Sequence, residues 1–185
     1  MEAFLVSTGL VALAEIGDKT QLLSLVLAAR FRKPWPIVLG ILASTLLNHA
    51  FAAALGAWIS KAIGEIWMAR IVGVSFILMA AWILVPDKLD EEDGTARAGR
   101  GVFFTTAMLF FLAEMGDKTQ VATVVLGARY ESLVAVVAGT TLGMLLANVP
   151  VVFFGDAIAK RFPVAIIRRV TAVAFAVLGV FALLR

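Results

Sequence analysis

Two copies of one charged motif hold the residues of this chain that are best suited to bind a cation. Residues 15–20 read Glu-Ile-Gly-Asp-Lys-Thr, and residues 114–119 read Glu-Met-Gly-Asp-Lys-Thr. Each copy lies near the middle of an apolar stretch that is long enough to cross a bilayer. A carboxylate at that depth is energetically costly, so its presence indicates a functional site.

The four carboxylates of the two motifs, Glu15, Asp18, Glu114 and Asp117, are the predicted metal ligands. If the first motif is helical, Glu15 and Asp18 lie three residues apart on one face, with Lys19 on the same side. The glycine between them would let an ion or another backbone approach closely, and the helix could open there.

Pseudo-two-fold symmetry would bring the two motifs face to face near the middle of the membrane. Four ionised carboxylates and two lysines give a formal charge of −2, which suits one divalent cation. Ligands that are all oxygen favour hard ions such as Mg²⁺, Ca²⁺ and Mn²⁺. Clustered carboxylates in a low-dielectric site also tend to take up protons once the cation leaves. The cluster could therefore exchange a metal ion for H⁺, with the metal as cargo and no cofactor.

Other polar side chains at a similar depth could support this site with a ligand atom or a hydrogen bond. They are Lys19, Thr20, Gln21, Lys118, Thr119, Gln120, Asn48, His49 and Asn148. Structural roles stay open for several of them. Each lysine could neutralise the glutamate of its own motif or extend toward an interface. The two asparagines and the histidine could instead make ordinary polar contacts between helices.

The composition is that of a membrane protein. Of the 185 residues, 62% are hydrophobic and 16% are charged, and the mean hydropathy is +0.99. A soluble domain of this size could not bury so much apolar surface. Six apolar runs have spanning length, at 3–29, 35–59, 66–85, 102–128, 132–158 and 164–184. The first run lacks the basic start and cleavage site of a signal peptide, so we expect it to be retained.

The two halves of the chain align without a gap when one is shifted by 99 residues, which pairs Phe76 with Phe175. The halves are 1–85 and 102–185, joined by a loop at 86–101, and each holds three spans. Because three is odd, the second half enters the membrane from the opposite side, as in inverted-repeat transporters. The predicted fold is an all-α integral membrane protein with six transmembrane helices in two inverted three-helix repeats. The alternative is a duplicated bundle without a transport role.

The basic residues predict the orientation, because Lys and Arg gather on the cytoplasmic side of membrane proteins. One side carries Arg30, Arg32, Lys33, Lys88, Arg97, Arg100, Lys160, Arg161, Arg168 and Arg169. The other carries Lys61, Arg70, Arg129 and Arg185. The first group should be cytoplasmic, which places both termini outside the cytoplasm in a multi-pass protein of the cell (inner) membrane. The acidic run at 87–93 would then be a solvated part of a cytoplasmic loop, with a weak cation-attracting or regulatory role as the alternative.

The paired Glu-x-Gly-Asp-Lys-Thr motif in a duplicated six-span chain resembles a known family of cation transporters. Its bacterial members include the MneA-type manganese exporters, and its eukaryotic members include Golgi and chloroplast transporters that exchange Mn²⁺ and Ca²⁺ against protons. Both motif copies match the family signature, and the resemblance covers essentially the whole chain. It implies Mn²⁺ or Ca²⁺ as the transported substrate and Glu15, Asp18, Glu114 and Asp117 as its binding residues. The short N-terminus resembles bacterial members, which implies manganese export across a plasma membrane.

We therefore predict a secondary transporter that exports Mn²⁺, in exchange for protons, rather than an enzyme. A Ca²⁺/H⁺ antiporter of the same architecture is the nearest alternative, followed by a passive cation channel and an exporter of small organic solutes. The expected partners are a divalent metal ion, protons and the lipid bilayer, with no nucleic acid, and a homo-oligomer stays open. With no cysteine and one histidine, the chain offers no HExxH or Ser/His/Asp arrangement.

Overall fold

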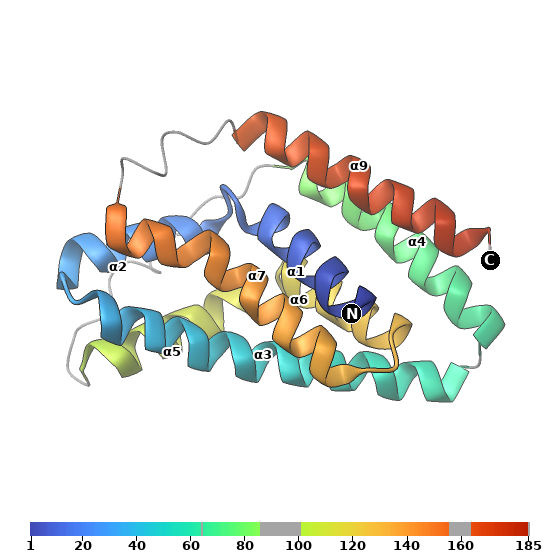
Figure 1. The fold of residues 1–185 in the computed structure, drawn as a ribbon, viewed down its shortest axis with the longest axis horizontal. Helices are drawn as coiled ribbons and strands as arrows, with labels where there is room; N and C mark the ends of the chain where they lie inside the picture. Colours follow the sequence, from blue (N-terminus) through green and yellow to red (C-terminus); the bar gives the residue numbers. More distant parts are fainter. Residues whose placement is uncertain (64, 86–100, 156–163, 185) are drawn as a thin grey trace.

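The computed structural model describes residues 1–63, 65–85, 101–155 and 164–184, and its ordered elements are all helices. They are α1 (Glu2–Glu15), α2 (Lys19–Phe31), α3 (Pro34–Ile63), α4 (Glu65–Ile83), α5 (Val102–Glu114), α6 (Lys118–Arg129), α7 (Leu133–Phe154) and α9 (Val164–Leu183) (Figure 1). The predicted all-α class is confirmed. Apart from Gly101, the predicted connector at 86–101 and its acidic run lie outside the described residues, as do six of the basic residues that were used for orientation.

Three of these helices are long and apolar enough to cross a membrane: α3 with 30 residues, α7 with 22 and α9 with 20. At about 1.5 Å per residue, 20 residues cover the roughly 30 Å of bilayer hydrocarbon. Shorter apolar helices lie at Trp67–Ile83 and Val102–Glu114. Large apolar side chains are exposed along the same elements, including Trp35, Phe51 and Phe104. Such surfaces suit lipid rather than water.

The first and fourth predicted spans are each broken into two helices at the charged motif. The motif is therefore not one continuous helix, and the chain opens at the glycine, as the sequence allowed. α1 ends at Glu15 and α2 begins at Lys19, and α5 and α6 repeat the same break. Gly17 and Gly116 adopt φ angles of 81° and 75°. This left-handed conformation interrupts a right-handed helix, and glycine adopts it at little cost because it has no Cβ.

Helix packing follows the 99-residue register of the sequence. α1 packs against α7, its counterpart α5 packs against α3, and α4 packs along α9. The close approaches also correspond. A Cβ added at Gly139 would lie 2.6 Å from the Phe4 carbonyl oxygen, and one at Gly40 would lie 2.9 Å from that of Phe103. The missing side chains of these glycines allow the helices to pack closely.

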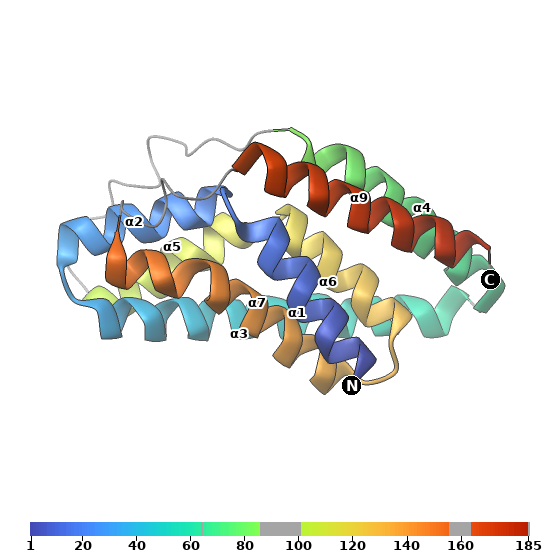
Figure 2. The same cartoon turned by 45° about the horizontal axis from the view of Figure 1, so that its top comes forward.

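Both chain ends lie toward one end of the molecule, which we call the terminal end, and the turn from α2 to α3 lies at the opposite end (Figures 1 and 2). Buried apolar side chains form two clusters along this axis. The terminal cluster consists of Ala3, Leu10, Ala53, Met68, Val72, Phe76, Met79, Ala80, Ile83, Ala122, Val125, Leu126, Val136, Ala172, Phe175 and Ala182. The opposite cluster consists of Val11, Leu23, Leu27, Ile37, Ile41, Leu109, Phe110, Ala113, Met144 and Val152. From the two helix breaks, α1 and α6 extend toward the terminal end, and α2 and α5 extend toward the opposite end (Figures 1 and 2).

Candidate metal site at the two helix breaks

Each helix break places a glutamate at the end of one helix and an aspartate at the start of the next. Glu15 and Glu114 are the last residues of α1 and α5, and Asp18 and Asp117 are the N-caps of α2 and α6. Both glutamates are fully buried, and both aspartates are 4% exposed. Because the helix ends between them, Glu15 and Asp18 do not share a helix face as the sequence had suggested.

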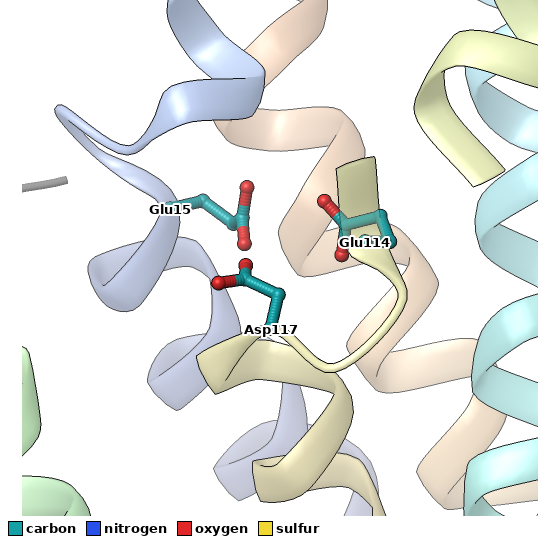
Figure 3. A group of neighbouring side chains, drawn as sticks. All are labelled: Glu15, Glu114 and Asp117. Atoms are coloured by element: carbon teal, nitrogen blue, oxygen red, sulfur yellow. The ribbon is translucent and has the colours of Figure 1, made fainter. Parts of the chain in front are cut away.

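Three of the four predicted ligands come together. Glu15, Glu114 and Asp117 each offer a carboxylate oxygen, and these oxygens all lie within 4.8 Å of one another (Figure 3). A hard cation holds oxygen ligands at about 2.0–2.6 Å, so ligands on opposite sides of one ion are about 4–5 Å apart. The spacing therefore fits one cation between the three carboxylates. Asp18 is buried but lies outside this group of three.

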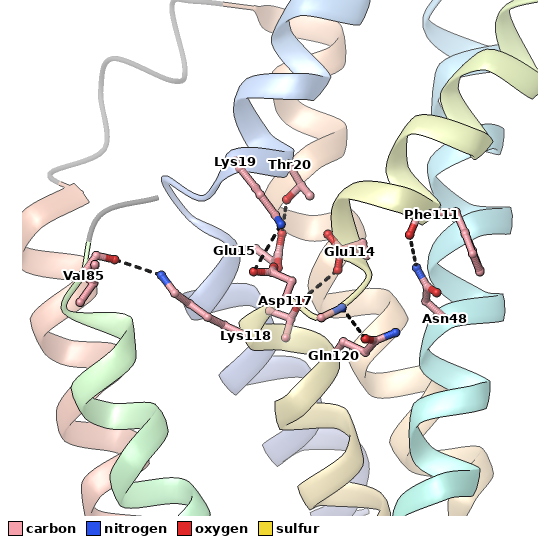
Figure 4. Close-up of polar contacts among 12 residues, drawn as sticks. Glu15, Lys19, Thr20, Asn48, Val85, Phe111, Glu114, Asp117, Lys118 and Gln120 are labelled. Atoms are coloured by element: carbon pink, nitrogen blue, oxygen red, sulfur yellow. Dashed lines mark hydrogen bonds and ion pairs between the residues drawn. The ribbon is translucent and has the colours of Figure 1, made fainter. Parts of the chain in front are cut away.

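Two threonine hydroxyls orient the glutamates in the same way in both motifs. Thr20 donates to Glu15 Oε2 over 2.6 Å, and Thr119 donates to Glu114 Oε2 over 3.0 Å (Figure 4). The other oxygen, Oε1, of each glutamate is buried and has no hydrogen-bond partner within the described part of the chain. Leaving a buried acceptor unsatisfied is costly, so each Oε1 is prepared to bind a cation or a proton.

The motif glutamines brace the breaks rather than face the carboxylates. Gln21 Oε1 accepts a hydrogen bond from the Gly17 amide over 2.9 Å, and Gln120 Oε1 accepts one from the Gly116 amide over 2.7 Å. These bonds satisfy amides that lose their helical partners at the break. Gln21 Nε2 also donates to the Ala147 carbonyl, which ties the first break to α7.

Within the contacts that the structure describes, Lys19 and Lys118 bind different groups, although they occupy equivalent positions of the two motifs. Lys19 Nζ lies 3.8 Å from Asp117 Oδ1, so it pairs across the two repeats instead of with Glu15 four residues away. Lys118 Nζ donates to the Val85 carbonyl, just beyond the end of α4, over 3.0 Å (Figure 4). With the three carboxylates ionised and Lys19 charged, the group carries three negative charges and one positive, which leaves −2. One divalent cation would neutralise it.

The remaining predicted supporting residues lie around this group. Asn148 is fully buried, its Nδ2 donates to the Met144 carbonyl over 3.1 Å, and Ser24 donates to its Oδ1 over 2.8 Å. Asn48 donates to the Phe111 carbonyl in α5, which is a contact between helices. His49 is fully buried, and neither ring nitrogen has a hydrogen-bond partner among the described residues.

Met115, the one motif residue that differs between the two copies, is 54% exposed and points away from the buried carboxylates. Sequence reasoning missed Ser24, although its repeat counterpart Thr123 also carries a hydroxyl and could have drawn attention to it. It also missed the Val85 carbonyl, which no side-chain pattern could have revealed.

Comparison with known proteins shows which sequences this chain resembles. The family profile described as "Divalent cation/proton antiporter GDT1" matches residues 3–91 and 102–185. A Vibrio cholerae protein named "Putative manganese exporter" is 53% identical over 173 residues, which cover 93% of this chain and 86% of that protein. A GDT1-like protein of Synechocystis is 29% identical over 87% of this chain and 86% of its own length. "GDT1-like protein 4" of rice is 25% identical over 86% of this chain and 65% of that protein. No solved structure matches the chain significantly.

Proposed function

Because the chain belongs to the GDT1 family of divalent cation/proton antiporters, we propose that it exports Mn²⁺ from the cell in exchange for protons. Membership of this family makes the chain a membrane-bound cation transporter rather than an enzyme. The observation that carries the proposal is the buried group of Glu15, Glu114 and Asp117, whose oxygens are spaced for a single ion.

The proposed architecture has six membrane crossings in two inverted repeats, 1–85 and 102–185. One support is the pair of helix breaks, which lie at equivalent residues of the two halves. A second is that α1 of the first half packs on α7 of the second, while α5 of the second half packs on α3 of the first. The group of three carboxylates draws on both halves, as expected for a site between inverted repeats at the middle of the membrane. We place both termini outside the cytoplasm of a multi-pass protein in the cell membrane, from the distribution of basic residues.

The exchange of metal for protons follows from the charge of the group. At −2, it can be neutralised by one divalent cation or by two protons. A bound cation favours the ionised carboxylates, and its departure from a buried site favours the protonated form. Glu15 and Glu114 are the proposed proton carriers, since each has one buried oxygen without a hydrogen-bond partner in the described structure.

Mn²⁺ is the proposed cargo because the Vibrio cholerae relative carries that ion in its name. Ca²⁺ is the second candidate, because carboxylate, hydroxyl and amide oxygens are also the ligands that Ca²⁺ prefers. Asp18 is proposed as the fourth ligand of the transport cycle, and the threonines, glutamines, lysines, Asn48, His49 and Asn148 as its supporting residues.

Transport into sealed proteoliposomes tests this proposal. Purified protein is given Mn²⁺, Ca²⁺ or Mg²⁺ on one side, while a trapped dye follows the internal pH at a clamped membrane potential. We expect Mn²⁺ flux together with opposite proton movement, and the same result for Glu131→Gln, which alters an exposed carboxylate far from the motifs. Mn²⁺ flux without proton movement would favour a passive channel, and faster Ca²⁺ flux would favour the second candidate.

A further inference from the structure

α4 and α9 form a closely packed pair. Phe76 and Phe175, which correspond in the two repeats, meet edge to face with ring centroids 5.7 Å apart. A Cβ added at Gly179 would lie 2.8 Å from the carbonyl oxygen of Gly73, so the two backbones approach directly. Contacts of this kind hold two membrane helices together as a unit.

This pair packs on one half of the molecule only. It contacts α1 and α6, which lead from the breaks toward the terminal end, and among the described residues it has no comparable contact with α2 or α5. Figures 1 and 2 show the pair beside the terminal half. The terminal cluster contains side chains of α4 and α9, whereas the opposite cluster contains none. The carboxylate group lies at the boundary, so α4 and α9 flank it from one side.

Near the carboxylate group, the α4–α9 pair makes different contacts with the two equivalent motifs. The Lys118 ammonium, in a side chain that is 4% exposed, donates to the Val85 carbonyl at the end of α4. Thr171 Oγ1 of α9 lies 3.2 Å from the Leu13 carbonyl oxygen of α1 and 2.9 Å from the Ile167 carbonyl oxygen of its own helix, so its one proton is shared between them. Val164 lies against Gly17. At the second break, a Cβ on Gly116 would have no neighbour within 4 Å.

We propose that Lys118 is a positioning residue that holds the α4–α9 pair against the terminal half, and that Lys19 performs the same task in an alternative arrangement. In that arrangement the pair packs against α2 and α5, and Lys19 donates to the carbonyl of Leu184, the repeat counterpart of Val85. This inference rests on the proposed transport function, because it describes how one site opens to each side in turn.

The physical reason lies in the near-identity of the two motifs. Helices built from equivalent sequences can pack in two related ways of similar free energy, and a few contacts then decide between them. A lysine ammonium buried in an apolar region needs an acceptor, and the last carbonyls of a helix lack intrahelical partners. Here Lys118 has such a carbonyl, while Lys19 lies beside Asp117 with 23% of its side chain exposed. One lysine is therefore bound to the α4–α9 pair and the other is not. In the alternative arrangement Lys19 would be the bound lysine and Lys118 the other.

Distance measurements between spin labels test this proposal without any metal. The chain has no cysteine, so labels can be placed at Leu39→Cys near the opposite end of α3 and Val180→Cys near the terminal end of α9, both exposed. Movement of the pair toward α2 and α5 would shorten the distance between them. The variants are Lys118→Met, Lys19→Met and the exposed control Lys61→Met, all in lipid nanodiscs at one pH.

We expect Lys118→Met to raise the ratio of short to long distances by roughly tenfold or more, since it removes a charged hydrogen bond. Lys19→Met should shift the ratio the other way, Lys118→Arg should keep the long distance, and Lys61→Met should match the wild type. Thr171→Val, which removes the hydroxyl shared between α1 and α9, should shift the ratio in the same direction as Lys118→Met but by less, and it serves if Lys118→Met does not fold. Shifts in the same direction for both lysines, or no shift in either folded variant, would overturn the proposal. The proposed transport function is tested separately, because it would fail if the wild-type protein carried no Mn²⁺ in proteoliposomes, whatever the spin-label distances are.

Discussion

The Thr20 hydroxyl offers a sharp test of whether the carboxylate group binds the metal. Thr20→Val keeps the shape of the side chain and removes the donor that holds Glu15 Oε2 at 2.6 Å. Hydrogen bonds from partners of metal ligands are worth about 10–100-fold in metal affinity, or about 1.4–2.8 kcal/mol. The distance is short enough for a charge-assisted bond, so we expect a loss in the upper part of that range. Thr119→Val should lose less, because its bond to Glu114 is longer at 3.0 Å.

The assay is equilibrium Mn²⁺ binding to purified protein by titration calorimetry, with helix content checked by circular dichroism. Thr8→Val is the matched control, since its hydroxyl also lies in an apolar helix but donates to the Phe4 carbonyl away from the site. If Thr20 acts through Glu15, adding Thr20→Val to Glu15→Gln should change the affinity little further. Wild-type affinity in Thr20→Val, or fully additive losses in the double variant, would refute a binding role for the Glu15 carboxylate.

Three further outcomes are expected. Glu15→Gln and Glu114→Gln should each nearly abolish Mn²⁺ flux in proteoliposomes while the protein stays folded, because each removes a charged ligand that also accepts a proton; wild-type flux in either would exclude that glutamate from transport. Mn²⁺ binding should release protons and weaken as the pH on the loading side falls, because protonated carboxyls no longer bind the ion; calorimetry in buffers of different ionisation enthalpy measures this, and an affinity that does not change with pH would contradict it. In the proposed topology, a cysteine at position 92 should react with impermeant thiol reagents only from the cytoplasm and one added after residue 185 only from outside, and labelling of both from one side would exclude six crossings.

The sequence was sufficient to propose the residues of the site, because an intramembrane carboxylate has few reasons to be present other than function. It was also sufficient for the helical class, since long apolar runs satisfy their backbone groups in a membrane only as helices or closed barrels. It allowed the helix to open at the motif glycine but could not decide that the chain breaks at Gly17 and Gly116. A single glycine in an apolar run fits both an unbroken helix and an interrupted one, and the glutamines that brace these breaks look like any other polar residue.

Tertiary packing alone decided which groups meet. Two nearly identical motifs predict identical surroundings, yet the structure selects Asp117 rather than Asp18 for the group of three, and it gives Lys19 and Lys118 different partners. The reason is that the α4–α9 pair lies on one half of the molecule, so equivalent residues meet different neighbours. A repeated sequence determines the helices of each half. It does not determine whether α4 and α9 pack on α1 and α6 or on α2 and α5, since that choice depends on contacts between residues far apart in the chain.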